Sequence, residues 1–266
     1  MRPPYTQRER SMPSVKRGVW GLFLLIPGVL IGGIGFYVGP PSYELSLLPG
    51  SSNTYTIEVI SAVDTTLYMR VYSADWLITP DGGRRYYPAD SLPVSCAGWI
   101  VLNPVEFELP PQGRQTVRMT INVPPDVVGE YWCVVFAEAL PIPSQWVPML
   151  RVTGRVGSLV FVEIAGTGVK QGEITNLEFS DGNVVLVFQN TGSVHLRPYA
   201  EVCLVNADGD TVWQDAVERF LVLPEGTREL TFPVTANLPS GVYTVVSKVD
   251  YGTEEVLVGE RKIRIE

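Results

Sequence analysis

Apolar and polar side chains alternate with a period of two along most of the chain after Pro41. Tyr43, Leu45 and Leu47 form one such run, and Ile57 and Val59 belong to the next. This period is typical of β-strands with one face buried, because successive side chains point to opposite faces of a sheet. No segment after residue 41 has the spacing of an amphipathic helix. The pattern therefore predicts an all-β body.

Turn residues divide this body into short strands. Pro49-Gly50, Asp81-Gly82-Gly83, Asp181-Gly182-Asn183 and Asp208-Gly209 separate the apolar runs at the spacing expected of a β-sandwich. The expected strands lie near residues 43–47, 55–59, 67–71, 76–78, 86–87, 99–102, 105–109, 117–121, 131–136 and 157–164, and then near 174–179, 184–188, 200–205, 211–213, 220–223, 230–234, 242–249 and 256–265. Gly166-Thr167-Gly168 separates the two series. We expect two tandem immunoglobulin-like β-sandwich domains, at 40–166 and 170–266.

The N-terminal part of the chain has a different character. Gly18 to Val38 contains no charged residue and follows Lys16-Arg17. A helix of this length spans about 30 Å of hydrocarbon, and the basic flank orients its N-terminus toward the cytoplasm. We therefore expect a basic cytoplasmic region at 1–17 and a signal or membrane-anchor helix at 18–39. The sequence leaves open whether this helix is cleaved as a leader or retained as an anchor. Either way the body is extracytoplasmic, in the periplasm or at the cell surface.

Charge and residue types exclude several classes of function. The net charge is −8, although residues 1–17 hold five basic residues against Glu9 alone. An acidic body disfavours nucleic acid as a partner, because phosphates need a basic face. His195 is the single histidine, it follows a turn, and no G-x-S-x-G motif is present. We expect His195 to be structural, and we expect neither an enzyme nor a cofactor or metal site.

The three cysteines show no C-x-x-C spacing. Cys96 and Cys133 belong to the first expected domain, and Cys203 belongs to the second. A Cys96–Cys133 disulfide is possible in an exported domain, but the sequence does not determine the pairing. The alternative is that all three are small buried hydrophobic residues.

A resemblance to a known family is carried by residues 99–136. The matching segments are Trp99–Pro104, Phe107–Pro110, Gln115–Met119, Val123-Pro124 and Gly129–Trp132. This stretch resembles the first domain of the PapD-like periplasmic pilus chaperones. The resemblance implies two immunoglobulin-like domains and a non-enzymatic role in assembling cell-surface or pilus-type structures. It also implies that other envelope proteins bind by β-strand addition.

The resemblance points to a binding surface at the loop that enters the last strand of the first domain. That loop is apolar and rich in proline here, and we expect Ile142, Trp146, Val147 and Met149 to contact a partner. The alternative is a loop folded over the core. These chaperones also hold the partner's C-terminal carboxylate with two basic residues, one in the first strand and one in the last strand of the domain.

In this chain the expected first strand, Tyr43 to Leu48, has no basic residue. Arg151 and Arg155, which precede the expected last strand, are the candidates.

A second resemblance leads to an alternative function. Pro49-Gly50, Asn190–His195 and Val212-Trp213 are similar to segments of immunoglobulin-like surface proteins of Gram-positive bacteria. This resemblance implies a cell-wall or polysaccharide-binding surface module.

Overall fold

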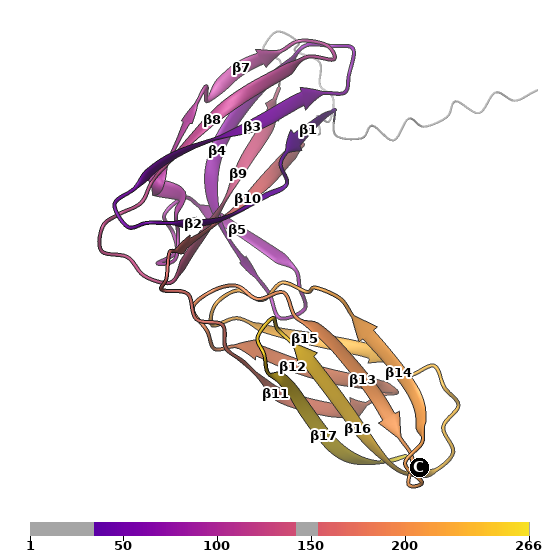
Figure 1. Cartoon of the computed structure of the whole chain (residues 1–266). Coiled ribbons are helices and arrows are strands. Elements are labelled where there is room, and N and C mark those ends of the chain that lie inside the picture. Colours follow the sequence, from indigo (N-terminus) through magenta and orange to yellow (C-terminus); the bar gives the residue numbers. More distant parts are fainter. Residues whose placement is uncertain (1–34, 142–153, 266) are drawn as a thin grey trace, which may run out of the picture. The chain divides into compact units, whose positions relative to one another are not determined.

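The computed structural model describes residues 35–141 and 154–265, and these residues form strands joined by turns (Figure 1). The first series of elements is β1 (Phe36–Gly39), β2 (Ser42–Leu47), β3 (Ser52–Ser61), β4 (Leu67–Ile78), β5 (Arg84–Pro88), the 3-10 helix η1 (Ala97–Trp99), β6 (Ile100–Asn103), β7 (Glu106–Leu109), β8 (Arg114–Asn122), β9 (Glu130–Leu140) and β10 (Arg155–Ile164). The second series is β11 (Gly172–Ser180), β12 (Asn183–Asn190), β13 (Tyr199–Val205), β14 (Thr211–Val217), β15 (Thr227–Pro233), β16 (Gly241–Asp250) and β17 (Val256–Ile265). Within the described ranges, no helix has the length and apolar character needed to cross a membrane.

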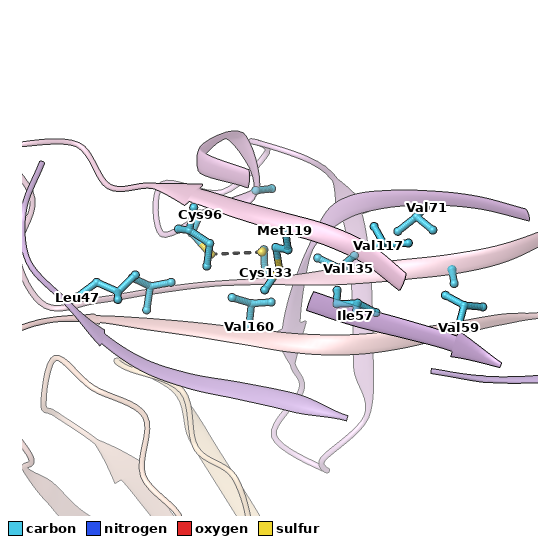
Figure 2. Packing of buried hydrophobic residues seen from close by; sticks show 14 of the residues in the cluster. Leu47, Ile57, Val59, Val71, Cys96, Val117, Met119, Cys133, Val135 and Val160 are labelled. Carbon is cyan, nitrogen blue, oxygen red and sulfur yellow. Dashed lines mark hydrogen bonds between the residues drawn. The ribbon is translucent and has the colours of Figure 1, made fainter. Parts of the chain in front are cut away.

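The first series makes a sandwich of two sheets. One sheet has the order β1-β3-β8-β6, and the other has the order β2-β10-β9-β4-β5, with β7 paired to β4. Alternate residues of β3 and β8, among them Ile57, Val117 and Met119, are fully buried between the sheets. They meet Val135 of β9 and Val160 of β10 from the opposite sheet (Figure 2). The alternation in the sequence sets this register, because a shift of one residue would turn the apolar set toward water.

Strand β9 is buried on both faces. Cys133, Val135 and Ala137 belong to the core between the sheets, whereas Trp132 and Phe136 belong to a separate apolar cluster on the outer face of the β9 sheet. This explains why the sequence is almost continuously apolar here instead of alternating. In the outer cluster the Trp132 Nε1 donates a hydrogen bond of 3.0 Å to the carbonyl oxygen of Trp76.

The second series makes a sandwich from the sheets β11-β12-β15 and β14-β13-β16-β17. Its core includes Leu186, Phe188, Val202, Leu204 and Val245, which are fully buried. The β11–β12 hairpin turns at Asp181 and Gly182, whose φ angles are 51° and 77°. Positive φ at both central residues is the requirement of a type I′ turn, which the Asp-Gly pair meets with little strain. The all-β fold with two β-sandwiches, expected from the sequence, is thus confirmed.

The expected strand at residues 220–223 is wrong. This segment lies between β14 and β15, and its only ladder contact among the described residues is an isolated bridge between Val222 and Leu196. Phe220 and Val222 enter the core of the second sandwich, whereas Leu221 and Leu223 pack in the outer cluster around Trp76. The segment is apolar because it has two apolar surroundings, not because it lies in a sheet.

The expected helix at 18–39 is also wrong over its last residues. Phe36–Gly39 forms strand β1, which pairs antiparallel with β3 between Phe36 and Ser61 and between Gly39 and Glu58. Phe36 is buried in the core of the first sandwich. An uncharged apolar run does not distinguish the end of a helix from a following strand, so the sequence placed the boundary too late. Residues 1–34, and with them the rest of the expected helix and the basic region, lie outside the described residues.

Candidate partner-binding site

Strand β10 offers an open edge over its first residues. Throughout Arg155–Glu163 it pairs antiparallel with β9, but its parallel pairing with β2 covers only Leu159–Ile164. The transition occurs at Ser158, whose Oγ donates a hydrogen bond of 2.7 Å to the Pro40 carbonyl oxygen. The second side of Arg155–Gly157 therefore has no strand partner among the described residues. An unpaired edge of this kind presents backbone N–H and C=O groups to an incoming strand.

A solvent-open cavity of about 410 Å³ lies beside this edge. Its lining includes Arg84 of β5, Arg155 of β10 and Arg197, which precedes β13. Tyr86 and Phe136 supply its aromatic part. Gly157 also lines it, and a Cβ there would lie 2.6 Å from Val134 Cγ2 and 2.9 Å from Phe136 Cε1. A side chain at position 157 would therefore displace the cavity wall. We call this cavity, with its three arginines, the arginine pocket.

The arginines differ in how they are held. The Arg155 guanidinium carbon lies 4.4 Å from the ring centre of Phe136 and 5.1 Å from that of Tyr86. Arg84 lies over the Trp76 ring at 5.7 Å. Among the described residues neither of these two arginines forms an ion pair. The Arg155 Nη1 also donates a hydrogen bond of 3.4 Å to the Tyr72 hydroxyl. The remaining N–H groups of a guanidinium stacked in this way match a carboxylate.

Arg197 is anchored to a carboxylate. Its Nη2 lies 2.6 Å and its Nε 3.1 Å from Glu44 Oε1 on β2. Both side chains are partly exposed. Because Arg197 is already paired, Arg84 and Arg155 are the two pocket arginines without an ion pair in the part of the chain that the structure describes.

The single histidine lies near this group without being part of the pocket. The His195 Nδ1 is 2.7 Å from Glu130 Oε1, and its backbone N–H donates a hydrogen bond of 2.6 Å to Glu130 Oε2. The ring packs on Phe161, with 4.3 Å between the ring centres. Glu130 is buried on β9. The ring is held between a carboxylate and an aromatic face, and this arrangement fixes the position of the segment.

The expected partner-binding residues are only partly described. Ile142, Trp146, Val147, Met149 and Arg151 lie outside the described residues. Arg155 is described, and it is the first residue of β10, whereas the sequence placed it before that strand.

The sequence reasoning missed Arg84 and Arg197 as partners of Arg155. Their signals were weak: Arg84-Arg85 follows the turn at Gly82-Gly83, and Arg197 follows the histidine by two residues.

The structure brings the two cysteines of the first sandwich together. The Sγ atoms of Cys96 and Cys133 are 3.2 Å apart, and both thiols are free and buried. Their pairing as a disulfide stays a prediction. Cys203 lies on β13 in the second sandwich.

No family model matches the chain, and a search of curated proteins finds no match. Among solved structures, one described as "Chaperone-tip adhesin complex is vital for synergistic activation of CFA/I fimbriae biogenesis" has a TM-score of 0.51 at 16% sequence identity, and the match covers 85% of this chain and 98% of that chain. The class 5 fimbriae chaperone CfaA has a TM-score of 0.49 at 18% identity, with coverages of 85% and 98%. The E. coli chaperone DraB has a TM-score of 0.44 at 16% identity, with coverages of 88% and 96%.

At 16% identity, the similarity to the first of these structures establishes the fold and no more. The chain shares the fold of the solved structure from the chaperone–tip adhesin complex. The resemblance predicted from residues 99–136 is confirmed at that level.

Proposed function

We propose that this chain, which has the PapD-like fold, is a non-enzymatic, exported protein-binding scaffold that assists or joins the assembly of cell-surface structures. A strand of a partner protein adds to the open edge of β10 at Arg155–Gly157. The partner's C-terminal carboxylate enters the arginine pocket. The observation that supports this proposal is the position of the pocket. Within residues 35–141 and 154–265, its Arg84 and Arg155 form no ion pair, and it lies beside a strand edge that has no pairing strand.

The β10 edge and the arginine pocket together fit the C-terminal end of a partner chain better than an internal loop of the partner. Backbone hydrogen bonds along β10 would supply affinity without sequence specificity. The free carboxylate would set the direction and the register of the added strand along β10, since a planar guanidinium binds a carboxylate through two parallel hydrogen bonds. The family resemblance implies one basic residue in the first strand, but β1 and β2 have none. We propose that Arg84 takes that role together with Arg155.

The location of the protein is part of the same proposal. A partner that completes its sheet on this edge is an envelope or surface protein, and the scaffold must meet it outside the cytoplasm. Residues 18–34, which are uncharged, would deliver the body across a membrane, as a cleaved leader or as a retained anchor. We also propose that the two sandwiches are the two domains expected on either side of residues 166–170, and that the first begins at Phe36.

Binding of peptides that differ only at the C-terminus tests the proposal. We expect a short peptide of alternating apolar and polar residues with a free carboxylate to bind the full chain, and the same peptide with a terminal amide to bind less tightly. Arg155→Ala should weaken binding of the carboxylate peptide by about 10–100-fold, since a hydrogen bond to a charged group contributes about 1.5–3 kcal/mol. Isothermal titration calorimetry measures both affinities.

The matched control is Arg114→Ala. Arg114 is an exposed arginine on β8, in the opposite sheet, and its Nη1 lies 3.5 Å from the Glu58 Oε2. Its loss should leave the peptide affinity unchanged. Equal affinity for the carboxylate and amide peptides, or wild-type affinity in Arg155→Ala, would overturn the arginine pocket as the carboxylate site. Binding to purified cell-wall material without any peptide binding would favour the polysaccharide-binding alternative instead.

A further inference from the structure

Two buried thiols face each other inside the first sandwich. Cys96 and Cys133 are both fully buried, and the Cys96 thiol donates to the Cys133 sulfur across 3.2 Å (Figure 2). We propose that these two cysteines form a disulfide that ties the segment before β6 to strand β9, and that Cys203 remains a thiol. The proposal rests on the exported location given under the proposed function, because disulfides persist in oxidising compartments.

The backbone around the pair has the geometry that a disulfide needs. Ser95 and Trp132 form an isolated parallel bridge, in which Trp132 N–H donates to the Val94 carbonyl oxygen at 3.0 Å and Cys96 N–H donates to the Trp132 carbonyl oxygen at 3.4 Å. The next residues along the two segments are Cys96 and Cys133. Neighbouring strands lie ~4.8 Å apart, which falls inside the Cα separation of ~4.4–6.8 Å that a disulfide tolerates.

Two carboxylates hold the segment in place independently of the sulfurs. Asp75 of β4 is fully buried and accepts hydrogen bonds from the Leu92 N–H at 2.9 Å and from the Ser95 Oγ at 2.5 Å. Asp90 accepts a hydrogen bond of 2.8 Å from the Gly98 N–H. These bonds fix the residues on both sides of Cys96. The cysteine is therefore positioned by the fold, and the disulfide would form without moving the backbone.

The chemistry is a two-step thiol–disulfide exchange with an external disulfide, such as oxidised glutathione or the disulfide of a thiol-oxidising protein. One cysteine thiolate attacks a sulfur of that disulfide and releases one thiol. The second cysteine thiolate then attacks the mixed disulfide and releases the other thiol. The two cysteines lose two electrons and two protons, and the external disulfide is reduced to two thiols.

Burial decides when this exchange takes place. Burial raises the pKa of the Cys133 thiol well above its usual range, and the hydrogen bond with Cys96 raises this pKa further. Because the thiolate is the reactive form, the folded pair reacts slowly with oxidants. The bond would therefore form while the sandwich is still folding. Once formed, it would be shielded from reductants by the same burial.

Cysteine counting in the denatured protein tests the pairing. The full chain is refolded with a mixture of reduced and oxidised glutathione, quenched in acid, denatured and alkylated, and the modified cysteines are mapped by mass spectrometry. We expect one of the three cysteines, Cys203, to be modified before reduction, and all three to be modified after it. This measurement needs no variant, so it does not depend on whether a substituted chain folds.

Thermal unfolding tests the consequence. The disulfide would close a loop between positions 37 residues apart. We expect reduction to lower the melting temperature of the first sandwich by about 10 °C, from the loop-entropy estimate and the usual enthalpy of small domains. Cys203→Ser should behave as the wild type. The double variant Cys96→Ala/Cys133→Ala should lose the dependence on reductant.

Three modified cysteines in the refolded protein before reduction would overturn the proposal, as would a Cys203 disulfide. The result is separate from the peptide-binding test. A mapped Cys96–Cys133 bond in a chain that binds no carboxylate peptide would contradict the proposed function and leave the disulfide standing. Peptide binding by a chain with three thiols would contradict the disulfide and leave the proposed function standing.

Discussion

Replacing Trp76 by alanine is expected to lower the free energy of unfolding of the first sandwich by about 3–5 kcal/mol, the usual cost of removing a large buried aromatic side chain. Trp76 is fully buried on β4 and meets Phe161 edge to face, with 5.9 Å between the ring centres. Its Nε1 also donates a hydrogen bond of 3.1 Å to the carbonyl oxygen of Cys133. The variant would therefore leave a cavity and remove this hydrogen bond. Urea unfolding, extrapolated linearly to water, measures the loss.

Two further variants make this prediction specific. Trp76→Phe keeps most of the buried ring and loses the hydrogen bond, so the loss of stability should be smaller than in Trp76→Ala. Tyr37→Ala removes a side chain that is 66% exposed, and it should change the free energy of unfolding by no more than about 0.5 kcal/mol. A loss below about 1 kcal/mol in Trp76→Ala would contradict the packing described for the outer cluster.

Replacing Glu130 by alanine should be nearly as damaging, with an expected loss of about 2–4 kcal/mol. The buried carboxylate of Glu130 receives the backbone N–H of His195 at 2.6 Å and lies 2.7 Å from the Nδ1 of the same residue. Alanine would leave both groups without an acceptor, and each unsatisfied buried group costs about 1–3 kcal/mol. Glu130 belongs to the first sandwich and His195 to the second, so their contact couples the unfolding of the two sandwiches. Calorimetry of Glu130→Ala should therefore show the two unfolding transitions further apart in temperature than in the wild type.

Glu130→Gln and Glu106→Ala provide the comparison. Glutamine retains an oxygen for the His195 N–H, so about half of the stability lost in Glu130→Ala should return. Glu106 lies in an exposed ion pair with Arg70 at 3.8 Å, and such pairs contribute about 0–1 kcal/mol. If Glu130→Ala were no less stable than Glu106→Ala, the Glu130–His195 contact would not hold the segment as described.

Most strands could be predicted because alternation is a local signal. Ile57 and Val59 of β3, and Val117 and Met119 of β8, alternate with polar residues because one face of each strand packs in the core. The two failures, at 36–39 and 220–223, are segments that are apolar at every position or nearly so. Such a run is consistent with a helix end, a buried strand or a loop between two apolar surroundings. Only the tertiary structure separates these possibilities: Phe36–Gly39 pairs with β3, and Leu221 packs in the outer cluster outside any ladder.

The candidate site could be predicted only in outline. The family resemblance led to the last strand of the first sandwich, and Arg155 does lie at its open edge. Arg84 reaches the same cavity from β5, and Arg197 reaches it from the segment before β13. Nothing in the spacing of these three residues indicates a common site. Strand order brings Arg84 and Arg155 to the same cavity, and Arg197 is held there by its contact with Glu44.

The amino-acid sequence by itself therefore determined the fold class, the turns and nearly all of the strands, since these depend on the period of side chains along a few residues. The tertiary structure alone decided which residues meet. It placed Arg155 beside Arg84, Cys96 against Cys133 and Glu130 against His195. Each of these pairs is distant in the chain, so its contact depends on strand order and register rather than on local pattern.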